Sequence, residues 1–530
     1  MIDLSRTRAG LLTQIEAPDP AGGPLTDITD PRVATGDAHV RVCGRTREDL
    51  FPVLKLALSE RFAAVPRMEL LRDLLMPLRN ALGNAFKHGN GSDPSKSVSV
   101  EIVFAQKGAL IAITDEGVGF DVALTFRRFQ EQERYFENEG SGFTNLHRAM
   151  STVSYENDGR TLLVCFQCAS SCPASVGDPS TDPGASSGEA HALPKVPDSV
   201  RLSTCLSAEL AKFAGGCARI ESCRVYVTRG CAGGDGESRY LLRVAGACGG
   251  PAETRILTGR LHAKEAAAKA DFAAATLLHE AKILKSVRIP RPVARPEGEP
   301  RLVLYDFDPW MNLREYLRYQ RSPTALQHCA SRVGRALAHL HRSQIVFPNV
   351  QTDLVEDGLQ GVFASAETCF QSLPAGSDLV SRFRASVQQI RERAASGRPP
   401  TRTPIHGALG WHCIHYGVDG RFYLYRFETC RRSDPGLDLG GFAADLLCFT
   451  LADHDTGAYR LGSDAFLRSY NSRAEYPLRE DELRPYIALA LFERLRRLEP
   501  PASTQAGQLL AALHAVLSHR GGGVASEVSA

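Results

Sequence analysis

Segment 78–90, LRNALGNAFKHGN, combines polar residues with helical spacing and is therefore a candidate binding element. Asn80, Asn84 and Lys87 fall on one side of a helix, because residues three and four apart share a face. The opposite side carries the apolar residues Leu78, Ala81, Leu82, Ala85 and Phe86. Asparagine is a poor helix former, so we expect a ligand to compensate for two of them, with Gly83 giving it room. A solvated helix face is the alternative.

A carboxylate follows the next apolar run in the sequence. Asp115 ends the predicted strand in LIAITDEGVGFD, and Gly117 and Gly119 come directly after it. A carboxylate at a strand end can accept a hydrogen bond from an exocyclic amine while glycine backbone packs against a flat ring. This arrangement is typical of a site for adenine.

A second glycine cluster lies further along, in GSGFTNLHRAM. Gly140, Ser141 and Gly142 precede a predicted helix, where exposed backbone N–H groups and the helix dipole favour a phosphate. Each glycine pair taken alone also describes many surface turns. The order and spacing of all three stretches together indicate a nucleotide site.

The elements that must position these residues alternate between strands and helices. A strand at 38–45 and a helix through 54–64 precede the polar-faced helix, and strands at 97–106, 109–117 and 161–167 follow it. We expect a mixed sheet with helices covering one side. A second set of strands, at 223–230, 238–246 and 254–263, is followed by mainly helical sequence after residue 310.

Composition limits the classes of partner. The chain has 530 residues, of which 43% are hydrophobic, and a formal charge of +2, so it has no basic field for nucleic acid or an anionic membrane. No signal peptide or membrane span is evident, and we expect a cytoplasmic protein. The 14 cysteines are scattered. Cys165 and Cys168 form a lone C-x-x-C spacing without the second pair that zinc would need, so we interpret them as buried or incidental thiols.

A segment rich in Ser, Pro, Gly and Asp divides the chain. We predict an N-terminal arm at 1–36, a nucleotide-binding domain at 37–168, a flexible linker at 169–200, a second domain at 201–520 and a disordered tail at 521–530.

The stretches NALGNAFKHGN, DEGVG and GSGF resemble, in order and separation, the N, G1 and G2 boxes of the GHKL ATPases. Within that superfamily the first unit is most similar to the anti-sigma-factor serine kinases, because of its HGN ending, short lid and compact length. The resemblance implies an α/β sandwich that binds ATP and Mg²⁺. It also implies a protein partner, such as a sigma factor or its antagonist, and a possible homodimer.

The resemblance assigns roles in metal and adenine binding. It makes Asn84 the Mg²⁺ ligand through its side-chain oxygen, places Lys87 near the phosphates and pairs Asp115 with adenine N6. Gly117 and Gly119 would shape the adenine pocket.

It also assigns roles to later residues. Gly140 and Gly142, on either side of Ser141, would cradle the phosphates. Thr161 matches the threonine or serine that supports a water network at Asp115.

One residue departs from the serine-kinase pattern. Those kinases usually carry a glutamate four residues before the magnesium asparagine, where this chain has Asn80, and an amide cannot accept a proton at neutral pH. The N-x-x-x-N spacing instead resembles the N box of sensor histidine kinases, but no histidine precedes residue 37. His88 is a candidate base or a structural contact, and the catalytic residue stays unassigned.

Segment 404–447 resembles the catalytic region of the aminoglycoside phosphotransferases and related small-molecule kinases, which implies a two-lobed α+β domain. His406 and Gly407 of its H-G-D motif are kept. Ala408 stands at the catalytic aspartate, Cys413 at the metal asparagine and Arg426 at the metal aspartate.

Phosphoryl transfer needs a carboxylate to orient the hydroxyl and oxygen ligands for the metal, and these replacements supply neither. We therefore interpret the domain as a pseudokinase that serves as an interaction module. Upstream, Arg260 matches the strand lysine, and Glu280 is the expected helix carboxylate. A helical domain in which HGALG is coincidental is the alternative.

The leading hypothesis is an α+β regulator in which a GHKL domain transfers the γ-phosphoryl group of ATP to a serine or threonine of a protein. Two alternatives stay open. One is a nonenzymatic, nucleotide-gated binding protein, and the other is a small-molecule phosphotransferase with an unusual C-terminal active site.

Overall fold

A computed structural model describes residues 2–18, 20, 23–28, 30, 32–105, 107–131, 152–167, 219–230, 236–245, 253–348, 359–371, 376–395, 402–452, 456–496 and 504–518. The predicted linker at 169–200, the predicted tail at 521–530, and the residues Gly140, Ser141 and Gly142 lie outside the described residues. The chain divides into two compact units. One comprises residues 1–193, 219–228 and 239–256, and the other comprises residues 194–218, 229–238 and 257–530.

A five-stranded sheet forms the centre of the first unit, with the strand order β1-β2-β3-β5-β4. Its strands are β1 (Ala38–Gly44), β2 (Val98–Ala105), β3 (Gly108–Asp115), β4 (Thr152–Glu156) and β5 (Thr161–Gln167). We expected a mixed sheet, and all four strand pairs are antiparallel. Parallel pairing occurs in the isolated bridges Ile2↔Val153 and Thr26↔Val40.

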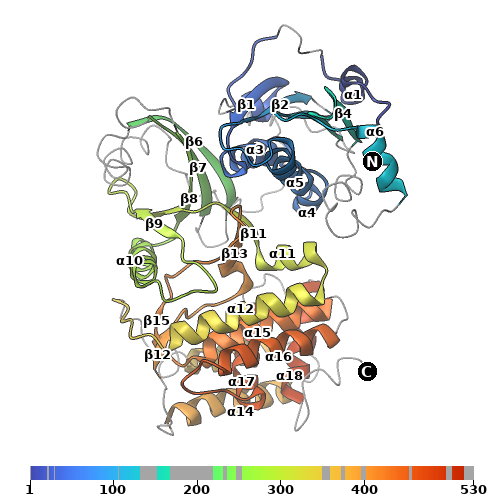
Figure 1. Ribbon diagram of the computed structural model, residues 1–530. Coiled ribbons are helices and arrows are strands. Elements are labelled where there is room, and N and C mark those ends of the chain that lie inside the picture. Colours follow the sequence, from blue (N-terminus) through green and yellow to red (C-terminus); the bar gives the residue numbers. More distant parts are fainter. Residues whose placement is uncertain are drawn as a thin grey trace, which may run out of the picture. The chain divides into compact units, whose positions relative to one another are not determined.

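Helices that follow β1 pack together beside this sheet (Figure 1). They are α3 (Arg47–Arg61), α4 (Arg67–Leu70), the π-helical segment η1 (Leu71–Leu75), α5 (Met76–Asn84) and the π-helical segment η2 (Ala85–Gly89). Helix α3 begins at a capping box, in which the Asp49 N–H donates to Thr46 Oγ1 over 3.2 Å and the Thr46 N–H donates to the Asp49 carboxylate over 3.0 Å. This cap fixes the corner between β1 and α3.

The N-terminal segment packs against the sheet through a further helix. Leu11 and Ile15, on and directly after α1 (Arg8–Gln14), are fully buried in one cluster with Leu110 and Cys165. The expectation that helices cover only one side of the sheet is therefore wrong, because the apolar side of α1 buries a second surface. Cys165 is buried as expected, and burial raises its pKa to about 12. Short helix α2 (Arg32–Thr35) and helix α6 (Val122–Gln130) complete the described helices of this part.

A second five-stranded sheet has the order β6-β7-β8-β10-β9. Its strands are β6 (Arg219–Gly230), β7 (Gly236–Ala245), β8 (Glu253–Leu261), β9 (Arg291–Ala294) and β10 (Leu302–Asp306). Helix α10 (Glu265–Ala281) follows β8, and its residues Ala274 and Leu278 lie in one buried cluster with Val303 of β10.

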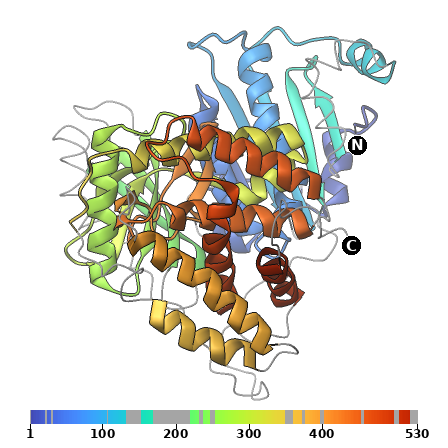
Figure 2. The same ribbon diagram turned by 90° about the horizontal axis from the view of Figure 1, so that it is seen from below.

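Two small antiparallel sheets connect to the helical part of the second unit. They are β11-β13-β14, from Pro309–Asn312, Ile414–Gly417 and Phe422–Leu424, and β12-β15, from Thr403–Ile405 and Arg431–Ser433. Figures 1 and 2 show the helices of this unit gathered against one another. They are α11 (Leu313–Gln320), α12 (Pro323–His341), α13 (Leu359–Gln371), α14 (Gly376–Ala395), α15 (Gly436–Ala452), α16 (Thr456–Asn471), α17 (Glu480–Arg496) and α18 (Thr504–Ser518).

Both units combine helices with antiparallel sheets, which confirms the predicted α+β class. Within the described ranges, none of the helices has the length and apolar character needed to cross a bilayer.

Candidate functional site

The polar-faced helix predicted from the sequence is formed by α5 and η2. Leu78 and Leu82 are buried, whereas Asn80 and Asn84 are half-buried and Lys87 is exposed. The two predicted faces are therefore present, except that Phe86, which was expected on the apolar side, is half-buried and lines the cleft described next. Helical period alone predicted the other positions correctly, because the buried side packs in the core of the unit.

A cleft of about 600 Å³ runs along the polar face. Four of the predicted site residues line it, namely Asn80, Asn84, Lys87 and His88. The capped corner between β1 and α3 contributes Arg45, Thr46, Arg47 and Glu48. The sequence analysis missed this corner, because it lies more than thirty residues upstream and its capping box marks only the start of a helix.

Electrostatics favour an anion in this cleft. Its cations are Arg45, Arg47, Arg79 and Lys87, and its carboxylates are Glu48 and Asp93. Arg47 Nη1 lies 3.8 Å from the position that a Cβ on Gly83 would occupy, so the opening left by this glycine is beside a guanidinium. An excess of positive charge around a half-open cleft suits a polyphosphate.

The two asparagines fit a divalent ion. Neither Asn80 nor Asn84 has a hydrogen-bond partner for its side chain among the residues that the structure describes. Mg²⁺ takes oxygen ligands and is commonly held by one or two protein groups together with phosphate oxygens and water. Half-buried amide oxygens that face a cationic cleft provide such ligands.

Asp115 lies at the end of β3, where it packs against the HGN segment. Its Oδ1 accepts a hydrogen bond of 2.9 Å from the N–H of Gly117. A Cβ on Gly89 would stand 2.2 Å from Asp115 Oδ2, and one on Gly117 would stand 1.9 Å from the Gly89 carbonyl oxygen. Burial raises the pKa of Asp115. Two glycines are thus required for the helix end to reach the carboxylate.

Asn90 completes this junction. Its N–H donates to the Ala85 carbonyl five residues back over 2.8 Å, and this bond closes the π-helical turn η2 at the end of the helix. Such turns are frequent at functional sites. Its side-chain oxygen accepts from the N–H of Glu116 over 2.8 Å, and its amide donates to the Ser97 carbonyl over 3.0 Å. Sequence reasoning used the HGN ending only as a family signal and did not assign it this role.

Thr161 is buried at the start of β5, beside the end of β3. Its hydroxyl lies 3.0 Å from that of Thr114 and accepts from the Asn157 side chain over 2.9 Å. The strand register pairs Thr161 with Thr114, one residue before Asp115. The predicted role in a water network at Asp115 stays a prediction.

Gly119 lines a different hollow of about 670 Å³, formed by residues 118–122 and 155–159. Its φ of +77° is in the left-handed region, and a Cβ there would stand 2.1 Å from the Asp158 carbonyl oxygen, so only glycine fits. Asn80, Asn84, Lys87 and His88 thus line one cleft, and Gly119 lines another hollow. Asp115, Gly117 and Thr161 line neither of these two.

A glycine substitution tests the junction directly. Gly89→Ala is expected to destabilise the first unit by about 1–3 kcal/mol, because its Cβ overlaps Asp115. If Asp115 moves aside, ATP affinity falls by roughly tenfold or more. Circular dichroism melting and an ATP titration measure the two effects.

Gly83→Ala is the matched control on the same helical segment, because its Cβ has 3.8 Å of clearance. It is expected to keep or raise the melting temperature, by about 0.5–1 kcal/mol of stability. A Gly89→Ala protein that melts and binds ATP like the wild type would contradict the close packing.

In the second unit, the backbone of the loop at 406–413 is held by hydrogen bonds to Asp438, and position 408 carries no carboxylate. Asp438 accepts hydrogen bonds from the N–H groups of His406 and Gly407, over 2.7 Å and 2.8 Å. Ala408 is exposed and brings no acceptor. Arg426 has φ +76°, a strained value for a residue with a side chain. Its cation stands where the resemblance would place a metal-binding aspartate.

The structure corrects the predicted helix carboxylate, Glu280. Glu280 is exposed near the end of α10 and does not pair with Arg260. Arg260 Nη1 instead lies 3.5 Å from Asp271 Oδ2, and its guanidinium makes a two-pronged ion pair with Glu428. Asp271 also accepts from the N–H of Phe427 over 2.7 Å. The buried helix carboxylate is therefore Asp271.

Comparison with known proteins supports the interpretation of the first unit. Residues 53–166 match the family model of the histidine kinase-like ATPase domain, a range that contains every site residue predicted above. The chain is 26% identical over 125 residues to an anti-sigma F factor of Geobacillus kaustophilus, covering 23% of this chain and 84% of that protein. An anti-sigma F factor of Geobacillus stearothermophilus is 25% identical over the same coverage.

Solved structures similar to the chain include kinases of small molecules. The choline kinase LicA from Streptococcus pneumoniae is 11% identical with a TM-score of 0.39, covering 60% of this chain and 99% of that chain. A microcompartment-associated aminopropanol kinase is 14% identical with a TM-score of 0.41, covering 59% and 97%.

Proposed function

We propose that the first unit binds ATP and Mg²⁺ in the cleft along α5 and transfers the γ-phosphoryl group to a serine or threonine of a protein partner. A sigma factor or its antagonist is the kind of partner that the similarity to anti-sigma F factors suggests. The second unit acts as an interaction module without phosphotransferase activity.

The observation that carries this proposal is a pair of half-buried amides, Asn80 and Asn84, in a cationic cleft inside the family match. Neither amide has a hydrogen-bond partner in the part of the chain that the structure describes. Asn84 would hold the metal through its side-chain oxygen, and Lys87 would face the phosphates. A bound Mg²⁺ neutralises charge on the β- and γ-phosphates. Asp115, held by Gly89 and Gly117, would accept a hydrogen bond from the adenine amino group.

The transfer itself needs a group that takes the proton of the acceptor hydroxyl. The hydroxyl oxygen forms a bond to the γ-phosphorus, the bond to the β-phosphate oxygen breaks, and ADP leaves. Asn80 cannot take the proton, but Glu48, Asp93 and His88 line the same cleft. Asp93 is a poor base, because hydrogen bonds from Ser95 lower its pKa. Glu48 and His88 are therefore the groups that we propose for this step.

Two observations favour a noncatalytic second unit. Ala408 offers no carboxylate to orient a hydroxyl, and Arg426 places a cation where an oxygen ligand would be needed. A missing catalytic group also keeps one further candidate function open for the first unit. Because Asn80 replaces the expected base, the chain could bind nucleotide and a partner without turnover.

A labelling experiment separates kinase from binder. The full chain is incubated with γ-labelled ATP, Mg²⁺ and a cell extract, beside the Asn84→Ala and Glu48→Gln variants. Wild type is expected to label a protein on serine or threonine, and Asn84→Ala is expected to lose at least about 100-fold of this transfer, since the metal ligand supports the charge of the reaction.

The outcomes are distinct. Equal labelling by wild type and Asn84→Ala would eliminate the kinase assignment for the first unit. ATP binding without any labelling would favour the nucleotide-gated binder. Loss of labelling in Glu48→Gln with unchanged ATP affinity would identify Glu48 as the base. Normal labelling in this variant would leave His88 as the proposed base.

A further inference from the structure

A cavity of about 780 Å³ lies among the helices of the second unit, and all its lining residues belong to that unit. The wall comes from the loop 407–412, from α15 and α17, from single positions on α11 and α14, and from two positions each on α13 and α18. Ala408, at the position of the missing catalytic aspartate, is exposed and lines it. The volume is in the range of drug-sized ligand pockets.

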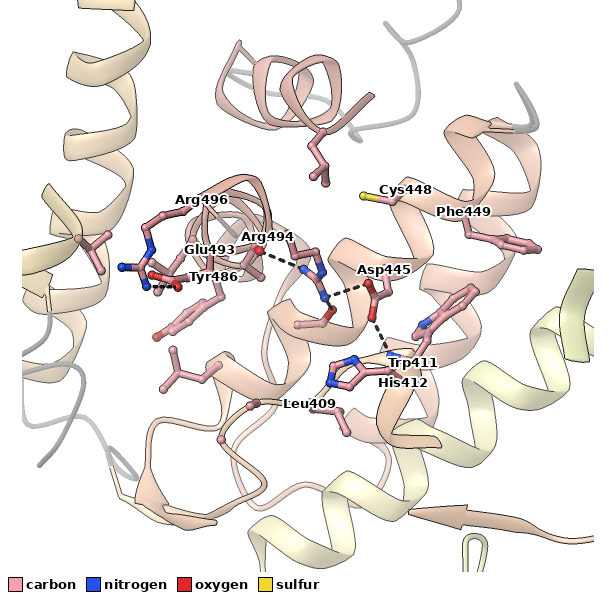
Figure 3. Close-up of a pocket in the computed structure, with 18 of the residues that line it drawn as sticks. Leu409, Trp411, His412, Asp445, Cys448, Phe449, Tyr486, Glu493, Arg494 and Arg496 are labelled. Carbon is pink, nitrogen blue, oxygen red and sulfur yellow. Dashed lines mark hydrogen bonds and ion pairs between the residues drawn. The ribbon is translucent and has the colours of Figure 1, made fainter. Parts of the chain in front are cut away.

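The acidic groups of the cavity are already neutralised by neighbouring arginines (Figure 3). Arg494 lies 3.0 Å from Asp445, and it also donates to the Gly441 carbonyl over 2.8 Å. Arg496 lies 2.7 Å from Glu493. Neither carboxylate is therefore left to attract a cationic ligand, because each has its counter-charge within contact distance.

Much of the remaining lining is aromatic or apolar, and its other polar side chains include Arg314, Ser365, Gln508 and His412. Trp411 is buried and packs against Phe449, with ring centroids 5.1 Å apart. Tyr486 and Leu489 add apolar surface from α17. Aromatic walls of this kind favour flat apolar molecules through offset or edge contacts.

His412 is the polar side chain that the loop 407–412 contributes to this cavity. Its side chain is exposed to the cavity, and it has no hydrogen-bond partner among the described residues. Burial of the ring, followed by the nearby Arg426 cation, lowers its pKa to about 3. The ring is therefore neutral at pH 7 and offers one donor and one acceptor.

We infer that this cavity binds an uncharged aromatic small molecule whose polar group hydrogen bonds to His412. Because Ala408 borders the cavity, the molecule is bound without being phosphorylated. The second unit is then a ligand-binding sensor, and this inference does not depend on nucleotide binding in the first unit.

The test uses N-phenyl-1-naphthylamine, an uncharged dye with one N–H group that fluoresces in apolar surroundings. Titrated into the full chain, it is expected to bind saturably to one site. The two tryptophans of the chain, Trp310 and Trp411, both belong to the second unit. Binding is therefore expected to quench their emission by energy transfer to the dye.

Ala408→Trp fills the cavity and is expected to weaken binding by at least tenfold, and Ala490→Phe, from α17, is a second blocking variant. Ala511→Trp is the matched control, because this alanine is exposed on α18 and does not line the cavity. It is expected to bind like the wild type. His412→Ala is expected to weaken binding by about threefold to tenfold, as the loss of one hydrogen bond predicts.

The inference is overturned if the wild type shows no saturable binding, or if both folded blocking variants bind the dye as tightly as the wild type. It is also overturned if choline, a small cation, displaces the dye as effectively as 1-naphthol, an uncharged aromatic alcohol.

Discussion

Asp115→Asn is expected to lower the affinity of the full chain for ATP by at least about 100-fold, since a site built to hydrogen bond one group strongly rejects a mismatched one. The carboxylate can accept from the adenine amino group through either oxygen, whereas the amide presents a donor at one of the two positions. The hydrogen bond from the Gly117 N–H occupies Oδ1 and leaves Oδ2 beside Gly89. Isothermal titration with ATP and Mg²⁺ measures the loss.

The same substitution is expected to leave the ligand-free protein as stable as the wild type, or more stable. Burial raises the pKa of Asp115, so the folded state binds its proton more tightly than the unfolded state does. Above both pKa values the ionised carboxylate therefore opposes folding, and asparagine removes this charge. A melting temperature that is retained while the ATP-dependent increase disappears would separate a binding role from a structural one.

Glu116→Gln is the matched control for the adenine site. This neighbouring carboxylate is exposed, and its oxygens accept from the Ser97 N–H and hydroxyl, with the hydroxyl contact at 2.7 Å. Its carboxylate is bonded to Ser97 rather than to Gly89 or Asp115, so ATP affinity is expected to stay unchanged. If Asp115→Asn binds ATP as tightly as Glu116→Gln does, adenine recognition belongs to other residues.

The part of the first site that the sequence predicted is local. Asn80, Asn84 and Lys87 share a helix face because three and four residues separate them, and this relation needs no tertiary information. The part that escaped prediction is non-local. Gly89 meets Asp115, which lies 26 positions later in the chain, and glycine at a helix end is compatible with many simple caps. Helical periodicity therefore could not predict the contact between Gly89 and Asp115.

The docking of α1 has the same explanation. Leu11 and Ile15 are buried against β-strands about 100 to 150 residues later in the sequence, including the strand that contains Cys165. A seven-residue helix gives a weak periodic signal, and only the sheet surface that it covers makes its burial evident.

In the second unit, the motif identified the replaced residues but not the carboxylate on the preceding helix. The replaced residues Ala408, Cys413 and Arg426 were identified by their spacing after His406 and Gly407 within segment 404–447. The prediction named Glu280 as the helix carboxylate, and the structure places Asp271, nine residues earlier, in that role. At 100° per residue these lie on opposite sides of α10, so only one of Asp271 and Glu280 can face Arg260. The sequence did not say which side is buried.

Asp271→Ala is expected to destabilise the second unit by about 3 kcal/mol, at the lower end of the cost of breaking a buried charge pair, because Arg260 keeps Glu428. Asp271 is fully buried and also bonds the Phe427 N–H and, over 3.0 Å, the His262 ring. The buried Trp310 and Trp411 report unfolding of this unit alone. Urea denaturation followed by tryptophan emission should therefore show an earlier midpoint, whereas Glu280→Ala, on the exposed side of the same helix, should stay within about 0.5 kcal/mol of the wild type. Equal midpoints for the two variants would mean that the buried ion pair does not hold Arg260 and the segment at 426–428 together.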